Sequence, residues 1–373
     1  MALRQARWRV AFLCALIFPG SSSYSGAATL RKVWEIDLRK SYQGDLDERG
    51  REMPLVGMEF SPDGEEIAAI TRAAVVSGRR EYVIWVARAR SPETPVKSFG
   101  AQAVFGPESN LKDFSWSPSG SALDAGGSVF NLASGARCSV PEFGAFLGED
   151  EIIASTSTGY SAPESRFGIF DRGCRIKAEW VSPERWFLMD VSPERRVLFM
   201  EQPRMPHETL IVDPQDGRVL HRWQGADRPY GRFANSGRDI CGIVATTRLS
   251  GTSVGCWDLD SGKVHGVFPE NGGEPFAVSS RSSRIIVSNY RYFRGPIRDL
   301  DRNVFRDLVV WDFAAERAVV SWRPQFQAFG GDNYVDGRPP KRLDEMDKVA
   351  ISPDGQFVVE GGNGVIRLYR IEP

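Results

Sequence analysis

The sequence predicts an all-β protein, a seven-bladed β-propeller of four-stranded antiparallel blades that an N-terminal strand closes into a ring. One observation is a repeated unit, clearest at 349–371, in which two strands flank a Ser-Pro-Asp-Gly turn and a third strand follows. Three such strands cannot bury both faces alone, so they need like neighbours. A second observation is a set of landmark residues near the third-strand ends. These recur at intervals of 40 to 58 residues, which is typical of propeller blades: Trp85, Phe130, Phe170, Val212, Trp257, Trp311 and Tyr369.

The seven units follow one another in order along the chain. Their predicted bounds are 55–99, 114–140, 145–180, 187–223, 235–268, 277–322 and 349–371. Tight turns join the first two strands of the units, for example Ser-Pro-Asp-Gly at 61–64 and 352–355, and Ser-Pro-Ser-Gly at 117–120. In such turns Pro presets φ, Asp bonds nearby backbone N–H groups and Gly accepts a positive φ. No helical period longer than two turns follows the N-terminal segment, so the mature chain is expected to be nearly all β.

The seventh unit stops after three strands and lacks an outer strand. A donor for it lies at the other end of the chain, where 30–38 alternates polar and apolar residues as a strand does. We expect Val33 to Asp37 to pair as the outer strand of the seventh blade. Such closure removes the exposed edge that an open array would present.

The N-terminus has the features of an export signal. Arg4, Arg7 and Arg9 precede an apolar run at 10–18, and small residues follow through Ala28. Nine apolar residues rise about 14 Å as a helix, roughly half a bilayer, so a retained anchor is the weaker alternative. We therefore expect a signal peptide at 1–28, a single propeller domain at 29–373, no stable membrane span after cleavage, and a periplasmic or secreted protein.

Charge and motif content exclude several classes of function. The chain has 47 basic and 48 acidic residues, and removal of the three signal arginines leaves 44 against 48. No basic excess remains to bind nucleic acid phosphates. The three histidines, His207, His221 and His265, share no metal spacing, and no phosphate-binding glycine loop or calcium loop is present. The sequence therefore predicts no catalytic residue, no metal and no cofactor.

Four cysteines remain after signal cleavage, and an oxidising compartment would allow them to form disulfides. Cys241 and Cys256 lie in the second and third strands of the fifth blade, and equal counting from the hairpin centre places them opposite each other. This predicts a disulfide, with two buried free thiols as the alternative. Cys138 and Cys174 fall in neighbouring blades whose outer strands should diverge, and we expect no bond between them.

Several repeats resemble those of the WD40 family of β-propellers. Trp257-Asp258 and Trp311-Asp312 match the family dipeptide, and Phe170-Asp171 and Val212-Asp213 are weaker forms. The Ser-Pro-Asp-Gly hairpins are also common in WD40-like and TolB-like propellers. The Gly-His dipeptide that begins many WD40 repeats is missing. The resemblance implies a seven-bladed propeller over 29–371, and a fold of this kind does not fix function.

The predicted loops differ between the two faces of the ring. Turns between first and second strands and between third and fourth strands are short, and they fall on one face of the ring. Loops between second and third strands and between successive blades fall on the opposite face, and several of them are long, including 71–81, 157–166, 201–208, 291–307 and 324–347. Elaborated loops on a rigid scaffold commonly carry function. The richest loops hold the aromatic and Arg residues that are enriched at binding hot spots: Tyr290, Tyr292, Phe293, Arg294, Arg298, Phe326, Phe329 and Tyr334.

These patterns support two hypotheses of different kinds. The first is a non-enzymatic exported scaffold that binds a protein or peptide partner through its long-loop face. The second is a propeller enzyme, such as a lactonase-like hydrolase or a quinoprotein-like oxidoreductase, that uses acids and arginines at the channel mouth. The structural alternative is that the same loops only fill the mouth of the central channel and bind no partner.

Overall fold

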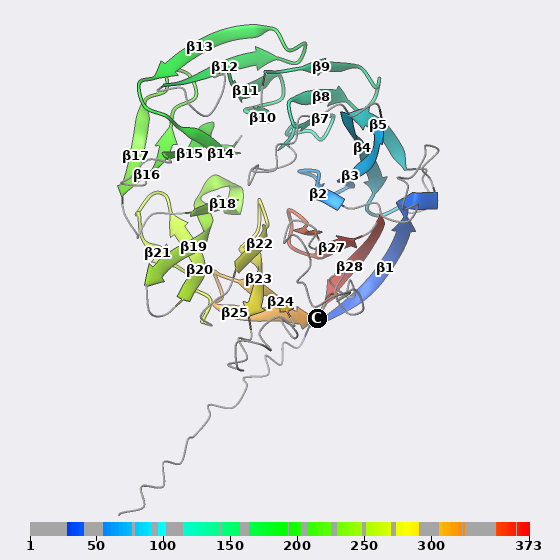
Figure 1. Ribbon diagram of the computed structural model, residues 1–373. Coiled ribbons are helices and arrows are strands. Elements are labelled where there is room, and N and C mark those ends of the chain that lie inside the picture. Colours follow the sequence, from blue (N-terminus) through cyan, green and yellow to red (C-terminus); the bar gives the residue numbers. More distant parts are fainter. Residues whose placement is uncertain are drawn as a thin grey trace, which may run out of the picture.

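The strands form seven separate four-stranded antiparallel sheets arranged around a ring (Figure 1). The computed structural model describes residues 28–40, 55–76, 79–91, 96–101, 115–141, 144–156, 164–192, 194–202, 208–224, 230–247, 251–269, 274–290, 306–322, 324, 348–362 and 364–373. In six of the sheets the strands run in chain order from the centre outwards, and in the seventh the first strand of the chain is the outermost. The predicted fold class is confirmed.

The first four blades are built from consecutive strands. Blade 1 contains β2 (Leu55–Phe60), β3 (Glu66–Val76), β4 (Arg79–Arg88) and β5 (Lys97–Ala101). Blade 2 contains β6 (Ser115–Trp116), β7 (Ala122–Ala125), β8 (Ser128–Asn131) and β9 (Arg137–Ser139). Blade 3 contains β10 (Gly144–Phe146), β11 (Glu151–Ser155), β12 (Ser165–Asp171) and β13 (Ile176–Ser182). Blade 4 contains β14 (Phe187–Ser192), β15 (Val197–Gln202), β16 (Glu208–Val212) and β17 (Val219–Gln224).

The last three blades complete the ring. Blade 5 contains β18 (Tyr230–Ala234), β19 (Asp239–Thr247), β20 (Gly251–Asp258) and β21 (Val264–His265). Blade 6 contains β22 (Glu274–Val278), β23 (Arg284–Tyr290), β24 (Arg306–Asp312) and β25 (Arg317–Trp322). Blade 7 contains β26 (Lys348–Ile351), β27 (Phe357–Gly362), β28 (Val365–Glu372) and β1 (Thr29–Asp37). Two short 3-10 helices, η1 (Leu38–Lys40) and η2 (Asn235–Gly237), are the helical elements of the described residues.

The two ends of the chain meet in blade 7. Strand β1 pairs antiparallel with β28, from Thr29 opposite Glu372 to Asp37 opposite Val365 (Figure 1). This confirms the predicted closing strand and extends it towards the N-terminus. The Trp34 indole is buried and donates to the carbonyl oxygen of Ala89 in blade 1 at 2.7 Å. The closing strand therefore joins blade 7 to blade 1 as well as to its own sheet.

The Ser-Pro-Asp-Gly turns form as their residues predict. In the turn of blade 1 the Gly64 N–H donates to the Ser61 carbonyl at 2.9 Å, and Gly64 has a φ of +76°. The Ser61 hydroxyl accepts the Glu66 N–H at 2.9 Å and donates to the Asp63 carboxylate at 2.6 Å. The turn is thus closed by both backbone and side-chain hydrogen bonds. The corresponding residues of blade 7 repeat these bonds.

Apolar clusters between neighbouring blades form the core. One cluster packs Trp34 and Leu368 of blade 7 against Met58, Phe60 and Trp85 of blade 1. Other tryptophans also link blades through their indole N–H groups, since Trp180 of blade 3 donates to Pro214 O, and Trp311 of blade 6 donates to Gly266 O, both at 3.0 Å. These contacts are those expected of a tryptophan that packs one blade on the next.

One predicted long loop is largely strand. The segment 71–81 was expected to be irregular, but β3 runs to Val76, β4 begins at Arg79, and Val76 pairs with Arg79. The β-branched Thr71, Val75 and Val76 favour extended backbone, and this propensity outweighs the polar and glycine content of the segment.

The prediction that Cys138 and Cys174 stay unbonded is wrong. A disulfide joins them, with their Cα atoms 5.9 Å apart. Cys138 lies in the outer strand β9, but Cys174 lies in the turn between β12 and β13, not in an outer strand. The divergence of outer strands therefore does not separate the two residues, and the turn reaches the rim of the preceding blade.

The second disulfide lies within blade 5. Cys241 pairs directly with Cys256 across β19 and β20, and a disulfide joins them with their Cα atoms 4.1 Å apart. Nearer the hairpin end Thr247 pairs with Gly251, and a bulge between Ile243 and Ala245 then shifts the register by one residue, which places Cys241 opposite Cys256. Both cysteines are fully buried.

Candidate functional site

The two faces of the ring differ in the length of their connections. We call the face with the turns from first to second and from third to fourth strands the turn face, and the opposite one the connection face. The longest connection on the turn face, 89–96, has eight residues. All longer connections leave and rejoin the strands on the connection face: 38–54, 102–114, 156–164, 291–305 and 323–347.

One of the residues predicted to bind a partner lies in the described part of the chain. Tyr290 is the last residue of β23, at the connection-face end of that strand. The other seven lie outside the described residues: Tyr292, Phe293, Arg294, Arg298, Phe326, Phe329 and Tyr334. Strands β23, β24 and β25 of blade 6 and β26 of blade 7 hold the ends of the two connections in which these residues occur.

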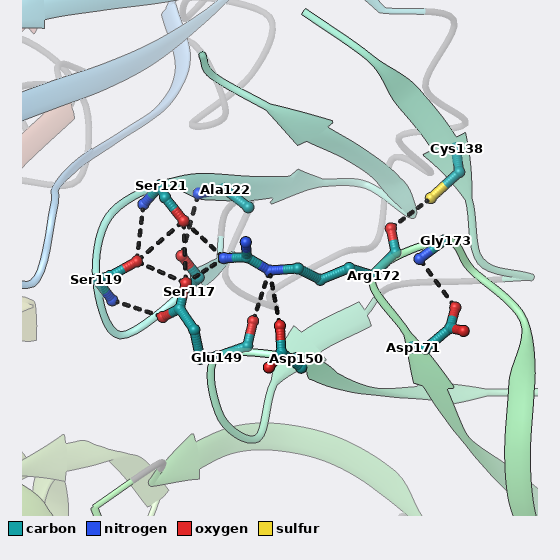
Figure 2. Close-up of polar contacts among 10 residues, drawn as sticks. All are labelled: Ser117, Ser119, Ser121, Ala122, Cys138, Glu149, Asp150, Asp171, Arg172 and Gly173. Atoms are coloured by element: carbon teal, nitrogen blue, oxygen red, sulfur yellow. Dashed lines mark hydrogen bonds and ion pairs between the residues drawn. The ribbon is translucent and has the colours of Figure 1, made fainter. Parts of the chain in front are cut away.

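Polar contacts between neighbouring turns characterise the turn face. The most extensive cluster joins blades 2 and 3, and Figure 2 shows Arg172 extending across it. The Arg172 guanidinium donates to the Glu149 carbonyl at 2.7 Å and to the Ser121 hydroxyl at 2.6 Å. It also pairs with the carboxylate of Glu149 and lies 3.5 Å from that of Asp150. One side chain of blade 3 thus connects three turns.

Glu149 is the carboxylate at the centre of this cluster. Its carboxylate accepts the Ser119 N–H at 2.9 Å, the Ser119 hydroxyl at 2.6 Å and the Ser121 hydroxyl at 2.9 Å. Burial acts to raise the pKa of Glu149, but the hydrogen bonds from Ser119 and Ser121 and the charge of Arg172 outweigh it and lower the pKa below its usual value. Glu149 is therefore an ionised structural link between the blades, with its oxygens already occupied.

Similar contacts continue around the turn face. Between blades 3 and 4, Glu151 accepts from Arg196 at 2.7 Å and from Lys177 of its own blade at 2.8 Å. Between blades 4 and 5, Arg195 pairs with Asp260 at 2.7 Å. Between blades 5 and 6, the Ser236 N–H donates to the Ser280 carbonyl at 2.7 Å. Between blades 6 and 7, the Ser279 hydroxyl donates to the Pro353 carbonyl at 2.7 Å, and Arg284 donates to the Gly355 carbonyl at 2.6 Å. The turns on this face thus bond to one another from blade 2 to blade 7.

Blades 1 and 2 leave a polar hollow on the same face. Its volume is about 390 Å³, and its lining comes from both blades: Asp63, Glu65, Glu66, Arg88, Arg90, Ser91, Ser119, Gly120 and Ser121. Several of these groups are already paired, since Glu65 lies 3.2 Å from Arg90 and Asp63 accepts from Ser61. Burial raises the pKa of Glu66, an effect that the charges of Lys97 and Arg88 partly offset. The hollow can accommodate a small polar group, and its lining has both signs of charge.

Buried acids elsewhere join strands and blades. Asp190 of β14 accepts the Phe233 N–H of blade 5 at 2.8 Å, and Glu360 of β27 accepts from the Tyr369 hydroxyl at 2.8 Å and the Trp322 indole at 3.3 Å. Asp239 lies 2.9 Å from Nε2 of His265. Each of these carboxylates has partners within the ring, so they form structural links rather than a converging catalytic group.

Asp124 is the exception among the buried acids. It is 1% exposed, and burial raises its pKa well above the usual value although backbone N–H groups of Gly144, Gly127 and Ala125 lower it. Its second oxygen, Oδ1, has no hydrogen-bond partner among the described residues. A glycine at 144 is required here, because a Cβ would lie 2.6 Å from the Asp124 carboxylate. Asp124 therefore belongs to the packing between blades 2 and 3.

The described part of the chain contains no group of three His, Cys, Asp or Glu residues placed to hold a metal ion. His221 and His265 lie in the outer strands β17 and β21, and His207 lies outside the described residues. Within the same described residues, no helix is long and apolar enough to cross a membrane.

Sequence analysis alone did not identify the Arg172 cluster or the hollow. No motif in the sequence marks which turns face each other across a blade boundary. The signal that could have found the cluster is the presence of charged residues in the first turns of successive units, such as Glu149 in the third unit and Arg196 in the fourth.

No protein-family model matches the chain, and no curated protein matches it in sequence. Solved structures do match its fold. The β-propeller domain of Myceliophteria thermophila Cps50 (Swd1) has a TM-score of 0.54 at 13% identity, covering 92% of this chain and all of the other. A chain of the mitotic checkpoint complex has a TM-score of 0.53 at 10% identity, covering 92% and 96%.

A third match is the β-propeller domain of the Trilobed protease from Pyrococcus furiosus, with a TM-score of 0.52 at 10% identity, covering 86% of this chain and 95% of that one. That domain is described as having an open velcro topology. The present ring differs, since β1 pairs with β28 and closes it. At these identities the matches show the propeller fold, and they include proteins of different functions.

Proposed function

We propose that this protein is a non-enzymatic, exported, WD40-like propeller that binds a protein or peptide partner through its connection face. The observation that carries the proposal is the difference between the two faces. On the turn face, the short turns are joined to one another by hydrogen bonds and ion pairs such as Arg172 with Glu149. On the connection face, all connections longer than eight residues leave and rejoin the described strands, and long connecting segments tolerate sequence change and commonly carry function.

The composition of two connections supports a protein partner. Connection 291–305 joins two strands of blade 6, connection 323–347 leads from blade 6 to blade 7, and together they supply Tyr, Phe and Arg residues. These residue types dominate binding energies at protein interfaces. Structural relatives from the mitotic checkpoint complex and Swd1 are consistent with such a role, although the likeness is one of fold.

Export is the second part of the proposal. The charged segment and short apolar run at the N-terminus favour it. The two disulfides, Cys138–Cys174 and Cys241–Cys256, support it too, because structural disulfides persist in oxidising compartments. N-terminal sequencing of protein purified from an exported fraction should find a chain that begins at Ala28 or Thr29, and a chain that retains Met1 would contradict export with cleavage.

The binding test compares variants on the two faces. A partner is first captured from the exported fraction by the mature chain, identified, purified and titrated against wild type. Tyr292→Ala, Arg294→Ala and Tyr334→Ala should each raise Kd by about tenfold or more, as hot-spot truncations of 1.4 kcal/mol or greater do. The matched control is Arg88→Ala in the hollow of the turn face, which should leave Kd unchanged.

The outcomes separate the alternatives. If Arg88→Ala weakens binding and the three connection-face variants do not, the partner binds the hollow and the face assignment is wrong. Native mass spectrometry of the purified mature chain tests the scaffold against an enzyme. A stoichiometric metal or small molecule retained by the chain would instead favour a hydrolase or oxidoreductase, and the search would move to the channel.

A further inference from the structure

We infer that the Cys138–Cys174 disulfide is a thiol–disulfide exchange site, and that its reduction loosens the turn-face contacts between blades 2 and 3. The bond crosses from the outer strand β9 of blade 2 to the turn between β12 and β13 of blade 3. It lies at the edge of the apolar cluster that Val129, Phe146 and Phe170 form between these blades. It therefore links two sheets that share no strand pairing.

The two disulfides within the described residues differ in how a reductant can reach them. Cys241 and Cys256 are 0% exposed, and their bond joins adjacent strands of one hairpin in the middle of an apolar cluster. Cys138 and Cys174 are both partly exposed, at the outer rim. Thiol–disulfide exchange requires a thiolate to approach a sulfur atom, so access decides which bond reacts first. The bond between blades is the accessible one in the folded protein.

The reaction needs a dithiol as its second reactant. A thiolate of the dithiol attacks one sulfur of the Cys138–Cys174 bond and forms a mixed disulfide, while the other cysteine leaves as a thiolate and takes up a proton. The second thiol of the reductant then attacks the mixed disulfide and releases the remaining cysteine. Two electrons and two protons pass to the protein, and the dithiol becomes a disulfide.

The turn that holds Cys174 also carries Arg172. Cys174 has a φ of 58°, in the left-handed region that residues other than glycine rarely adopt. The Cys138 sulfur lies 3.4 Å from the Arg172 carbonyl oxygen, and Figure 2 shows the Arg172 side chain extending from this point to Ser121 and Glu149. The disulfide thus fixes the base of the side chain that connects the turns of the two blades. Opening the bond lets the turn shift, and the contacts of Arg172 weaken.

The change would also reach the polar hollow. Ser119 and Ser121 line the hollow and at the same time bond to Glu149 and Arg172. When the Arg172 contacts weaken, this wall of the hollow loses partners that hold it in place. The redox state of the rim is therefore coupled to the shape of a surface between blades 1 and 2. This coupling is independent of which partner the connection face binds.

The first experiment maps which bond opens. The folded mature protein is treated with increasing dithiothreitol without denaturant, quenched with N-ethylmaleimide and digested for peptide mass spectrometry. Cys138 and Cys174 should be labelled at a dithiothreitol concentration at least tenfold below that needed for Cys241 and Cys256. Labelling of all four cysteines together, or of none until denaturant is added, would overturn the inference.

The second experiment follows the turns by hydrogen exchange. Under the selective reduction, amides of 117–121 and 147–150 should exchange faster, whereas those of 235–238 in blade 5 should not change. The double variant Cys138→Ser with Cys174→Ser should show the same pattern without reductant, and Cys241→Ala with Cys256→Ala should keep the response. The comparison of reduced with oxidised wild type needs no variant, so it still tests the coupling if a variant fails to fold. Unchanged exchange at 117–121 after selective opening would contradict the coupling.

Discussion

Replacement of Trp34 tests whether the N-terminal strand holds the ring together. Trp34 is 6% exposed and packs between blades 7 and 1, against Met58, Phe60 and Leu368. Truncation of a buried Trp to Ala costs about 3–5 kcal/mol through the cavity it leaves. The lost hydrogen bond to Ala89 O adds to this, since a buried carbonyl without a donor costs about 1–3 kcal/mol.

A matched control lies next to it in the same strand. Val33 lies at the register shift of β1 and is 45% exposed, so Val33→Ala should change the free energy of unfolding by no more than about 0.5 kcal/mol. Trp34→Phe separates the two contributions, because it retains most of the apolar contact and removes the N–H donor. We expect it to fall between Ala and wild type, about 1–3 kcal/mol below wild type.

Urea unfolding of the mature chain, followed by fluorescence and far-UV circular dichroism, gives the three free energies. A domain has about 5–15 kcal/mol of stability in total, so the loss at Trp34→Ala should be large enough to lower the midpoint clearly. If Trp34→Ala unfolds within 0.5 kcal/mol of Val33→Ala, the closing strand contributes nothing to the cooperative ring. Deletion of 29–38 should then also melt like wild type, and the reasoning from closure fails.

Three further predictions concern single sites. Replacing Cys138 and Cys174 together by Ser should lower the free energy of unfolding by up to about 4 kcal/mol, from the 36-residue separation and the chain-entropy relation, as measured in urea. Arg172→Ala, whose side chain is 30% exposed, should cost about 1 kcal/mol. The control is Arg175→Ala, whose side chain is 84% exposed and pairs with Asp171 of its own turn, and it should cost less than about 0.5 kcal/mol; equal losses would mean that the contact between blades contributes nothing. Asp124 has a folded pKa above its usual 3.8. Its contribution to the free energy of unfolding is therefore fully present below pH 3.8 and is lost as the pH rises through the folded pKa. Asp124→Asn keeps an acceptor oxygen and removes this titration, so its unfolding free energy should vary less between pH 4 and 8 and equal or exceed that of wild type at pH 7; an unchanged pH dependence would contradict the assignment.

The blade pattern could be predicted from sequence because it is local. The alternation of strand residues and the Ser-Pro-Asp-Gly turns act within a few residues, and each turn closes on its own atoms, as Gly64 and Ser61 show. The pairing of Cys241 with Cys256 is local in the same sense, since both lie in one hairpin, where the bulge between Ile243 and Ala245 completes their register. The closing strand required only that the last unit lack a fourth strand.

Features between blades could not be predicted in this way. Cys138 and Cys174 are 36 residues apart, and their approach depends on where the turn of blade 3 lies relative to the rim of blade 2. The Arg172 cluster and the hollow depend on the same relation between sheets that share no hydrogen-bonded strands. A repeat sequence fixes the conformation within each unit, whereas the contacts of one unit with the next depend on three-dimensional packing that has no short-range signal.

The two faces of the ring differ in what a change in length would cost. On the turn face, turns bond to those of neighbouring blades from blade 2 to blade 7, so an inserted residue in 117–120 or 147–150 would displace Ser119 or Glu149 from its partners. On the connection face, doubling the length of a flexible loop costs only about 0.6 kcal/mol in closure entropy. The connection face can therefore acquire long segments without loss of the ring, and the segments at blade 6 are the longest pair leaving any blade. A surface that varies at such low cost, on a scaffold fixed from its other side, is the physical basis for placing partner recognition there.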